Sequence, residues 1–334
     1  MTAGSTTSST GGGRRRSAAS VPDLVSRARA GDARAVARLI SLVEDESPLL
    51  REVMAEICSR GPAGSQAQVV GITGSPGVGK STSTNALVTE LRRTGKRVGV
   101  LAVDPSSPFS GGALLGDRVR MQDHALDSDV YIRSMASRGH LGGLAWTTPQ
   151  AVRVLDTAGC DVILIETVGV GQSEVEIAAL ADTTLVLLAP GMGDGIQAAK
   201  AGILEIGDLY VVNKADREGA DQVRRDLRSM LALAERREGA WKPPIVATVA
   251  ARSEGLDEVA TEIDRHFAWL TETGELMMRR TRRARDEIEA IAVTALRRSW
   301  GDVHGRSELD ELATAVVAGE SDPYTAADAL LEQF

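Results

Sequence analysis

Short apolar, β-branched segments alternate with stretches of helical periodicity through the middle of the chain. The helical stretches include Ser81–Arg93, Pro149–Leu155 and Glu218–Arg237. Continuous apolar segments separated by helices are typical of a parallel sheet with helices on both faces. We therefore predict an α/β fold with a mostly parallel central sheet over residues 65–273. The predicted strands are Val69–Thr73, Val98–Val103, Val130–Arg133, Val162–Glu166, Thr183–Ala189, Leu209–Val212 and Ile245–Val249.

Helical patterns flank this predicted domain on both sides. Apolar residues recur at three- and four-residue steps up to about Arg60, with a break at Gly31. This spacing predicts an N-terminal helical hairpin within residues 21–64. The pattern is helical again from Leu256 onward, and residues 274–334 are predicted to form a C-terminal helical segment.

The composition excludes several classes of protein. Of the 334 residues, 43% are hydrophobic and 25% are charged, as in a globular protein, and no apolar stretch approaches the ~18 residues of a membrane span. A net charge of −8 and 3% aromatic residues argue against nucleic acid as the main partner. Cys58 and Cys160 form no CxxC pattern, which disfavours a cysteine metal site and fits the cytoplasm. Residues 1–20 are rich in Ser, Thr, Gly and Arg, so we expect a disordered tail without a secretory signal.

The segment Gly74–Ser81 matches the phosphate-loop pattern G-x-x-x-x-G-K-[ST] in full. A predicted strand precedes it and a helical stretch follows it, which is the context that this pattern requires. Its glycines let successive backbone N–H groups turn toward one anion at a helix N-terminus. We expect Lys80 to bridge the β- and γ-phosphates of a nucleotide and the Ser81 hydroxyl to bind Mg²⁺. The predicted nucleotide-binding residues of this segment are Gly74, Ser75, Pro76, Gly77, Val78, Gly79, Lys80, Ser81 and Thr82.

A second segment, Asn213–Asp216, fits the pattern N-K-x-D and follows a predicted strand. Open α/β sheets bind their ligands at this end of the strands. The Asp216 carboxylate accepts hydrogen bonds from guanine N1–H and N2–H₂ together, a donor pair that adenine lacks. We expect the Lys214 stem to lie over the base and Asn213 to tie this loop to the phosphate loop. The sequence therefore predicts GTP or GDP as the ligand.

Acidic residues at strand ends are candidates for the metal site. Asp104 follows one predicted strand and Glu166 ends another. Mg²⁺ on a triphosphate needs one or two nearby carboxylates, which bind it directly or through water. Glu166 also begins a segment that matches the D-x-x-G element of GTPases with Glu in place of Asp, so Gly169 is expected to donate its N–H to the γ-phosphate. The catalytic candidates are Lys80, Asp104, Asp117, Glu166 and Gly169, and the metal-ligand candidates are Ser81, Asp104 and Glu166.

Other loops supply further candidates. Asp117 lies in a long Gly-rich segment that we interpret as a switch over the nucleotide, with its carboxylate near the metal or the metal's water. Val170 stands where many signalling GTPases carry a water-orienting glutamine, so we expect slow intrinsic hydrolysis that a partner alters. Gln172, two residues after Val170, is a substitute candidate for that glutamine. Val249, the last residue of the predicted strand Ile245–Val249, and Ala250 lie where a backbone N–H is expected to reach guanine O6. The remaining switch candidates are Arg138 and Lys200.

Taken together, these segments resemble the methylmalonyl-CoA mutase-associated GTPases, the MeaB/ArgK type of metalloenzyme-chaperone GTPase with a P-loop NTPase fold. The resemblance covers residues 21–334 and implies a chaperone that binds an adenosylcobalamin-dependent methylmalonyl-CoA mutase, gates its cofactor loading and protects it. It also implies a homodimer through the C-terminal helices and a third switch loop at Asp194–Lys200. The segments that carry it are Gly71–Ser81, Val103–Ser107, Gly116–Met121, Ile132–Gly139, Ile165–Glu174 and Asn213–Asp216.

Three alternatives stay open from the residues. A metallochaperone GTPase that delivers nickel or another metal generally carries a Cys or His cluster, which this sequence lacks. A small-molecule kinase, such as one linked to the transport of basic amino acids, needs ATP and an acceptor site, and Asn213–Asp216 argues against adenine. A nucleotide-dependent scaffold with negligible turnover is compatible with Val170.

Overall fold

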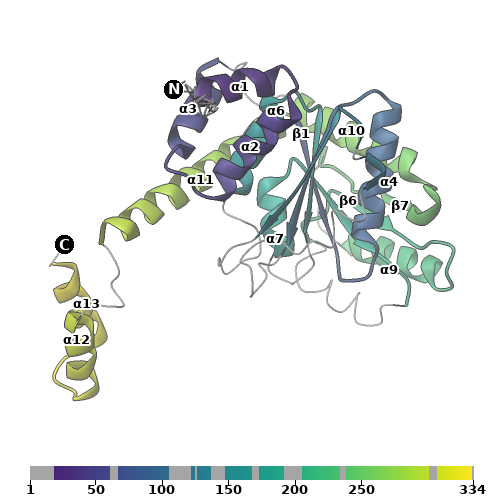
Figure 1. Ribbon diagram of the computed structural model, residues 1–334. Helices are drawn as coiled ribbons and strands as arrows, with labels where there is room; N and C mark the ends of the chain where they lie inside the picture. The colour runs from purple at the N-terminus through teal and green to yellow at the C-terminus, as the bar shows by residue number, and fades with distance from the viewer. Residues whose placement is uncertain are drawn as a thin grey trace, which may run out of the picture. The chain divides into compact units, whose positions relative to one another are not determined.

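The described part of the chain contains a seven-stranded sheet in the order β3-β2-β4-β1-β5-β6-β7, and every pair of neighbouring strands is parallel (Figure 1). The computed structural model describes residues 19–60, 67–104, 122–124, 126–136, 147–167, 173–191, 205–233, 238–300 and 307–332. The strands are β1 (Gln68–Thr73), β2 (Val98–Asp104), β3 (Val130–Ala136), β4 (Val162–Thr167), β5 (Thr183–Leu188), β6 (Leu209–Val212) and β7 (Ile245–Ala247). This confirms the predicted α/β fold.

The central strand of the sheet is β1, and the loops after β1, β4 and β6 begin on the same side of the sheet. This strand lies between β4 and β5, with Ile72 opposite both Glu166 and Leu185. Because the strands are parallel, their C-terminal ends meet along one side of the sheet, which we call the carboxyl edge. The opposite side, where the strands begin, is the amino edge. The segments after β1, β4 and β6 therefore all start from the carboxyl edge.

Helices cover both faces of the sheet because successive strand residues point to opposite faces. On one face, α4 (Lys80–Arg93) and α10 (Leu256–Glu272) pack against a core that includes Leu185 and Leu187. On the other face, Val186 and Leu188 pack beneath α9 (Ala220–Leu233). The remaining helices on this second face are α1 (Val21–Arg29), α2 (Ala33–Glu44), α3 (Leu50–Arg60), α6 (Thr148–Thr157) and α7 (Ser173–Leu180).

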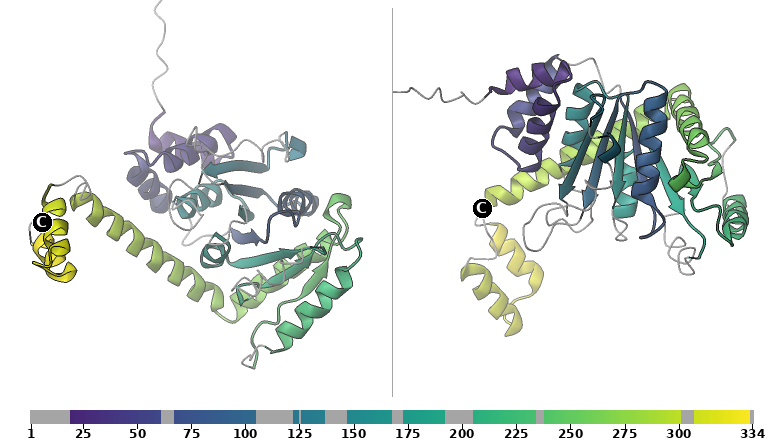
Figure 2. Two further views of the ribbon diagram at one scale, coloured as in Figure 1. Left: turned by 90° about the horizontal axis from the view of Figure 1, so that it is seen from below. Right: turned by 45° about the vertical axis from the view of Figure 1, so that its right-hand side comes forward.

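The N-terminal segment is helical as predicted, but residues 19–60 form three helices instead of a two-helix hairpin. Asp32 caps α2, since its side chain accepts hydrogen bonds from two backbone N–H groups of the first turn. The second break follows α2, where Glu46 has a φ of +47° and Pro48 disfavours helix at the residue before it. The three helices group on the opposite side of the sheet from α4 (Figure 2).

The chain divides into two compact units, Met1–Thr273 and Gly274–Phe334. The second unit contains α11 (Glu275–Trp300), α12 (Ser307–Val317) and α13 (Pro323–Leu331). In α12 and α13 the only described side chain that is buried is Ala326, and large apolar residues such as Ile288 of α11 and Val317 are exposed. None of the helices in the described residues is both long and apolar enough to span a membrane.

Candidate nucleotide-binding site

The phosphate loop joins β1 to α4 and has a backbone that glycine alone fits. Gly74, Gly77 and Gly79 all have positive φ angles, of +142°, +80° and +98°. A Cβ on Gly74 would lie 2.3 Å from the backbone oxygen of Leu187 in β5, and one on Gly79 would lie 2.5 Å from Nδ2 of Asn213. The glycines therefore serve both the turn itself and the close approach of neighbouring segments.

Lys80 is the first residue of α4, and its side chain returns into the loop that precedes it. Its ammonium donates hydrogen bonds to the backbone oxygens of Gly74 (2.6 Å) and Ser75 (3.2 Å). The residue is only 8% exposed, so this charge is held largely out of solvent. A phosphate bound at the N-terminus of α4 offers the ammonium a charged acceptor in place of these neutral carbonyls, and charge-assisted bonds are the stronger ones.

The residue after Lys80 faces a carboxylate from the neighbouring strand. The Ser81 hydroxyl donates a hydrogen bond of 2.6 Å to Oε1 of Glu166, which lies near the end of β4 and is 5% exposed. A hydroxyl and a carboxylate are the hard oxygen ligands that Mg²⁺ prefers. Within the described residues, no three His, Cys, Asp or Glu side chains cluster as a metal site. A magnesium ion at Ser81 and Glu166 would take its other ligands from phosphate, water and the candidate Asp104.

One further metal candidate, Asp104, lies within the described residues. Asp104 is the last residue of β2, and its backbone pairs with Ala136 of β3. Asp104 therefore lies at the carboxyl edge, two strands away from β1. The remaining candidates lie outside the described residues: Asp117, Arg138, Gly169, Val170, Gln172 and Lys200.

The loop after β6 is fastened to the phosphate loop by Asn213. Its Nδ2 donates to the backbone oxygen of Val78 (2.9 Å), while its Oδ1 accepts from the amide of Ala250 (3.0 Å) and the hydroxyl of Thr248 (3.3 Å). Asn213 is 3% exposed, so these hydrogen bonds are shielded from solvent. One side chain thus holds together the phosphate loop, the loop after β6 and the loop after β7, as the sequence predicted for the first two.

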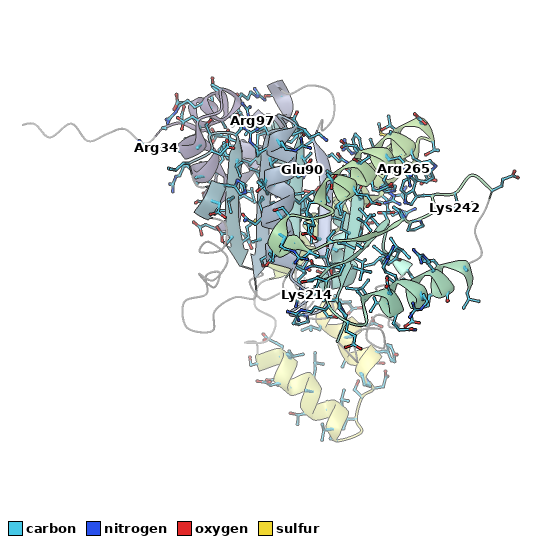
Figure 3. The ribbon with its side chains drawn as sticks, turned by 90° about the vertical axis from the view of Figure 1, so that its right-hand side faces the viewer. Arg34, Glu90, Arg97, Lys214, Lys242 and Arg265 are labelled. Atoms are coloured by element: carbon cyan, nitrogen blue, oxygen red, sulfur yellow. The ribbon has the colours of Figure 1, made fainter. Side chains whose placement is uncertain are left out.

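Lys214 and Asp216 lie beside this junction. Lys214 has a φ of +56°, and its ammonium donates to the backbone oxygen of Gly77 at 2.7 Å, so its stem runs from the loop after β6 to the phosphate loop. Figure 3 shows Lys214 at the carboxyl edge, far from Arg97 at the amino edge. The Asp216 side chain is 42% exposed, and its Oδ2 lies 3.8 Å from Nη2 of Arg252. A phosphate loop, a buried Asn and an exposed carboxylate at one edge are the parts of a nucleotide site with a base-reading end.

Comparison with protein-family models gives a match over residues 36–301 to the family described as methylmalonyl Co-A mutase-associated GTPase MeaB. The chain belongs to the MeaB family. It is a GTPase with the α/β fold of the P-loop NTPases.

Known relatives of this MeaB-family GTPase extend over most of its length. A Pyrococcus abyssi protein named as a GTPase is 46% identical over 315 residues, covering 94% of this chain and 96% of its own. The mouse protein named methylmalonic aciduria type A homolog, mitochondrial, is 37% identical and covers 79% of this chain and 65% of its own. A crystal structure titled LAO/AO transport system kinase has a TM-score of 0.72 at 27% identity, covering 93% of this chain and 96% of that one.

The structure changes the prediction for Val249 and Ala250 of the MeaB-family GTPase. The Val249 N–H donates to the backbone oxygen of Glu254 (3.1 Å), and the Ala250 N–H donates to Asn213. Both residues are buried, and both N–H groups are used within the protein. They therefore shape the loop after β7, and neither is a free donor for guanine O6 in this structure.

Sequence reasoning missed two contacts of this site. The Thr167 hydroxyl, next to Glu166, donates to the Thr73 hydroxyl at the end of β1 (3.4 Å), which links the start of the predicted switch to the start of the phosphate loop. Arg252 lies beside Asp216 although the two are far apart in the sequence. Neither contact follows from a spacing rule, because each joins segments that only the sheet brings together.

Proposed function

We propose that this GTPase binds the phosphates of GTP or GDP in the loop Gly74–Ser81 and the guanine base against Asp216. Lys80 holds the β- and γ-phosphates, and the Lys214 stem covers one face of the base. The N–H of Ala251, the next after the two that the loop uses, is the proposed donor to guanine O6. The observation that supports this arrangement best is the Asn213 side chain, which joins the three loops at one point.

We also propose that Mg²⁺ accompanies the nucleotide, held by Ser81 and by Glu166 and Asp104 directly or through water. When bound there, Mg²⁺ neutralises charge on the β- and γ-phosphates. The Ser81 hydroxyl and the Glu166 carboxylate already lie 2.6 Å apart, so both ligands are oriented before the cation arrives. Asp117 and Gly169 complete the proposed hydrolytic site.

For the cellular role, we propose a cytoplasmic chaperone that binds an adenosylcobalamin-dependent methylmalonyl-CoA mutase and uses GTP to gate and protect its cofactor. The match to the mutase-associated family over residues 36–301 supports this proposal most directly. The name of the mouse relative, which refers to methylmalonic aciduria, agrees with it.

Pull-down of the full chain with such a mutase, under GDP and under a non-hydrolysable GTP analogue, tests the chaperone role. We expect a complex whose affinity differs between the two nucleotides. Lys80→Ala, which removes the predicted phosphate contact, is the matched variant and should abolish the nucleotide dependence. Absence of a complex under both nucleotides rejects the role for that mutase and leaves the GTPase assignment intact.

We propose, further, a homodimer through residues 274–334. The described part of this unit leaves the apolar side chains of Met277 and Ile288 exposed at 70% and 67%, and exposed apolar surface favours association with a partner. In addition, α11 contains the arginine-rich run 279–285, whereas the described residues 307–332 contain acidic side chains and no Lys or Arg. Ile288→Arg should convert a dimer to a monomer in sedimentation equilibrium, and a monomeric wild type contradicts the proposal.

A further inference from the structure

The loop after β7 has a rigid tip. The backbones of Val249 and Glu254 exchange two hydrogen bonds, of 3.1 and 3.3 Å. Between and beyond them the chain turns through left-handed backbone at Ser253 (φ +57°) and Gly255 (φ +78°). A Cβ on Gly255 would lie 2.4 Å from the backbone oxygen of Ala247, so the turn has no room for a side chain at position 255. The backbone of Arg252, the residue at the tip, therefore has a defined position from which its side chain extends.

The Arg252 guanidinium is oriented by a carboxylate of its own loop. Its Nε lies 2.9 Å from Oε1 of Glu254, and its Nη2 lies 3.4 Å from Oε2 of the same side chain. This two-point contact matches the planar fork of arginine to a carboxylate. The Nη2 group also approaches Oδ2 of Asp216 at 3.8 Å. The same guanidinium thus faces one carboxylate that holds it and a second one at the proposed base-binding site.

We infer that Arg252 is a positioning residue that orients the Asp216 carboxylate for guanine and so contributes to discrimination among purines. The inference rests on the proposed role of Asp216 in the base site. A carboxylate that accepts from both N1–H and N2–H₂ of guanine must lie in the plane of the base. The Asp216 side chain is 42% exposed, so burial does not fix its rotation. The nearby cation from a second loop supplies that restraint.

The loop that carries Arg252 is itself tied to the base site. Ala250 and Thr248 donate to Asn213, and the Thr248 backbone oxygen accepts from the amide of Ala215 at 3.0 Å. Arg252 and Asp216 are therefore presented by two loops that share one anchor. Because both side chains are about half exposed, the effect is that of a surface ion pair, and we expect a change of about two- to fivefold in affinity.

The test compares GTP with inosine triphosphate, which keeps N1–H and lacks the 2-amino group. In Arg252→Ala we expect the dissociation constant of GTP to rise about two- to fivefold at low salt, and that of inosine triphosphate to rise less, so that the preference for GTP falls. Arg252→Lys keeps the charge and should restore at least half of the lost preference. At about 1 M salt, screening should remove the difference between wild type and Arg252→Ala.

Arg217 provides the matched control, since it is exposed, follows Asp216 directly and forms no ion pair within the described residues. Arg217→Ala should leave the preference for GTP unchanged. Equal weakening of both nucleotides in Arg252→Ala, or a loss that neither lysine nor salt alters, overturns the inference. Asp216→Asn separates the two levels: if it leaves guanine preference unchanged, the proposed base site fails; if it changes that preference while Arg252→Ala does not, only the role of Arg252 fails.

Discussion

The two edges of the sheet differ in what their polar side chains contact. At the carboxyl edge, the ammonium groups of Lys80 and Lys214 donate to backbone oxygens of the phosphate loop. At the amino edge, side chains contact one another and the backbone of Asp208. His266 is fully buried, with Nδ1 2.9 Å from the Thr183 hydroxyl and Nε2 3.4 Å from Oδ1 of Asp208, and Trp241 donates to the Asp208 backbone oxygen at 2.7 Å.

The difference indicates that the carboxyl edge is suited to ligand binding and that the amino edge contributes mainly to stability. A contact between an ammonium and a loop carbonyl is one that a phosphate can replace, so the carboxyl edge is suited to a ligand. His266 and Thr183 at the amino edge are buried and contact each other, and breaking a contact between buried polar groups costs folding energy. Variants at the carboxyl edge should therefore change activity without changing stability, and variants at the amino edge should do the reverse.

The largest effect is expected for Lys80→Ala, which removes the cation nearest the predicted phosphates. Loss of one preorganised group that stabilises transition-state charge lowers kcat by about 100-fold or more. We expect GTP hydrolysis, measured as phosphate release, to fall by at least that factor, while the midpoint of urea unfolding stays close to that of the wild type.

Lys96→Ala is the matched lysine control from the amino edge, where Nζ of Lys96 lies 2.6 Å from Oδ1 of Asp264. It removes the same side chain and the same charge, and hydrolysis should remain within twofold of the wild type. If Lys80→Ala hydrolyses GTP at the wild-type rate, Lys80 has no part in the reaction and the contrast between the edges disappears.

His266→Ala tests the amino edge. It removes a fully buried ring that contacts Trp241 (ring centroids 4.7 Å apart) and Trp269 (5.8 Å), and it takes away the neighbours of Thr183 and Asp208. Cavity formation and lost hydrogen bonds together should lower the free energy of unfolding by about 2–4 kcal/mol. Urea unfolding measures this loss, and KM for GTP below the transition should not change. A normal stability combined with a raised KM would place His266 in the functional site instead.

Asp216→Asn sharpens the comparison within the carboxyl edge, because this residue lies at the base-reading end and Lys80 at the phosphate end. The Asn side chain has an NH₂ group in place of one carboxylate oxygen, so it can no longer accept from guanine N1–H and N2–H₂ together. GTP affinity should therefore fall by at least ~1.4 kcal/mol, a factor of ten. Xanthosine triphosphate, whose oxygen at position 2 accepts from the new amide, should bind better than to the wild type. Competition binding with the two nucleotides measures both effects, and an unchanged guanine preference rules out the base assignment.

The sequence predicted most of the fold because the strands are continuous apolar segments. A run such as Val162–Ile165 is buried on both faces and has few alternatives to a central parallel strand. The phosphate loop was predictable for a similar reason, since the glycines at 74, 77 and 79 are required by local backbone geometry. The three-helix arrangement of residues 19–60 was not predicted, because the apolar residues keep a helical spacing on both sides of Pro48.

The contact of Asn213 with the phosphate loop was predicted from the sequence, but the contacts of the loop after β7 were not. The N–H groups of Val249 and Ala250 donate to Glu254 and Asn213. This arrangement depends on the turn at Ser253, and a positive φ is uncommon for serine and was not predicted there. The approach of Arg252 to Asp216 depends on the neighbouring positions of β6 and β7 in the sheet. Such details arise from tertiary packing and have no local signal.

The smallest effect is expected in acid, from the ion pairs of the amino edge. A hydrogen bond from Arg92, whose Nε lies 2.8 Å from Oδ2 of Asp127, holds the pKa of the Asp127 carboxyl below its ordinary value. A lowered folded-state pKa means that the stabilisation is complete above the ordinary value of about 3.9 and is lost as the pH falls through the folded value. Asp127 is partly exposed, so the contribution is at most about 1 kcal/mol. Asp127→Asn should therefore lower the free energy of unfolding at pH 7, and its stability should converge with that of the wild type as the pH falls below the folded-state pKa, while GTP hydrolysis at pH 7 is unchanged. A constant difference between the two proteins across this range would show that Asp127 stabilises the edge through packing and not through its charge.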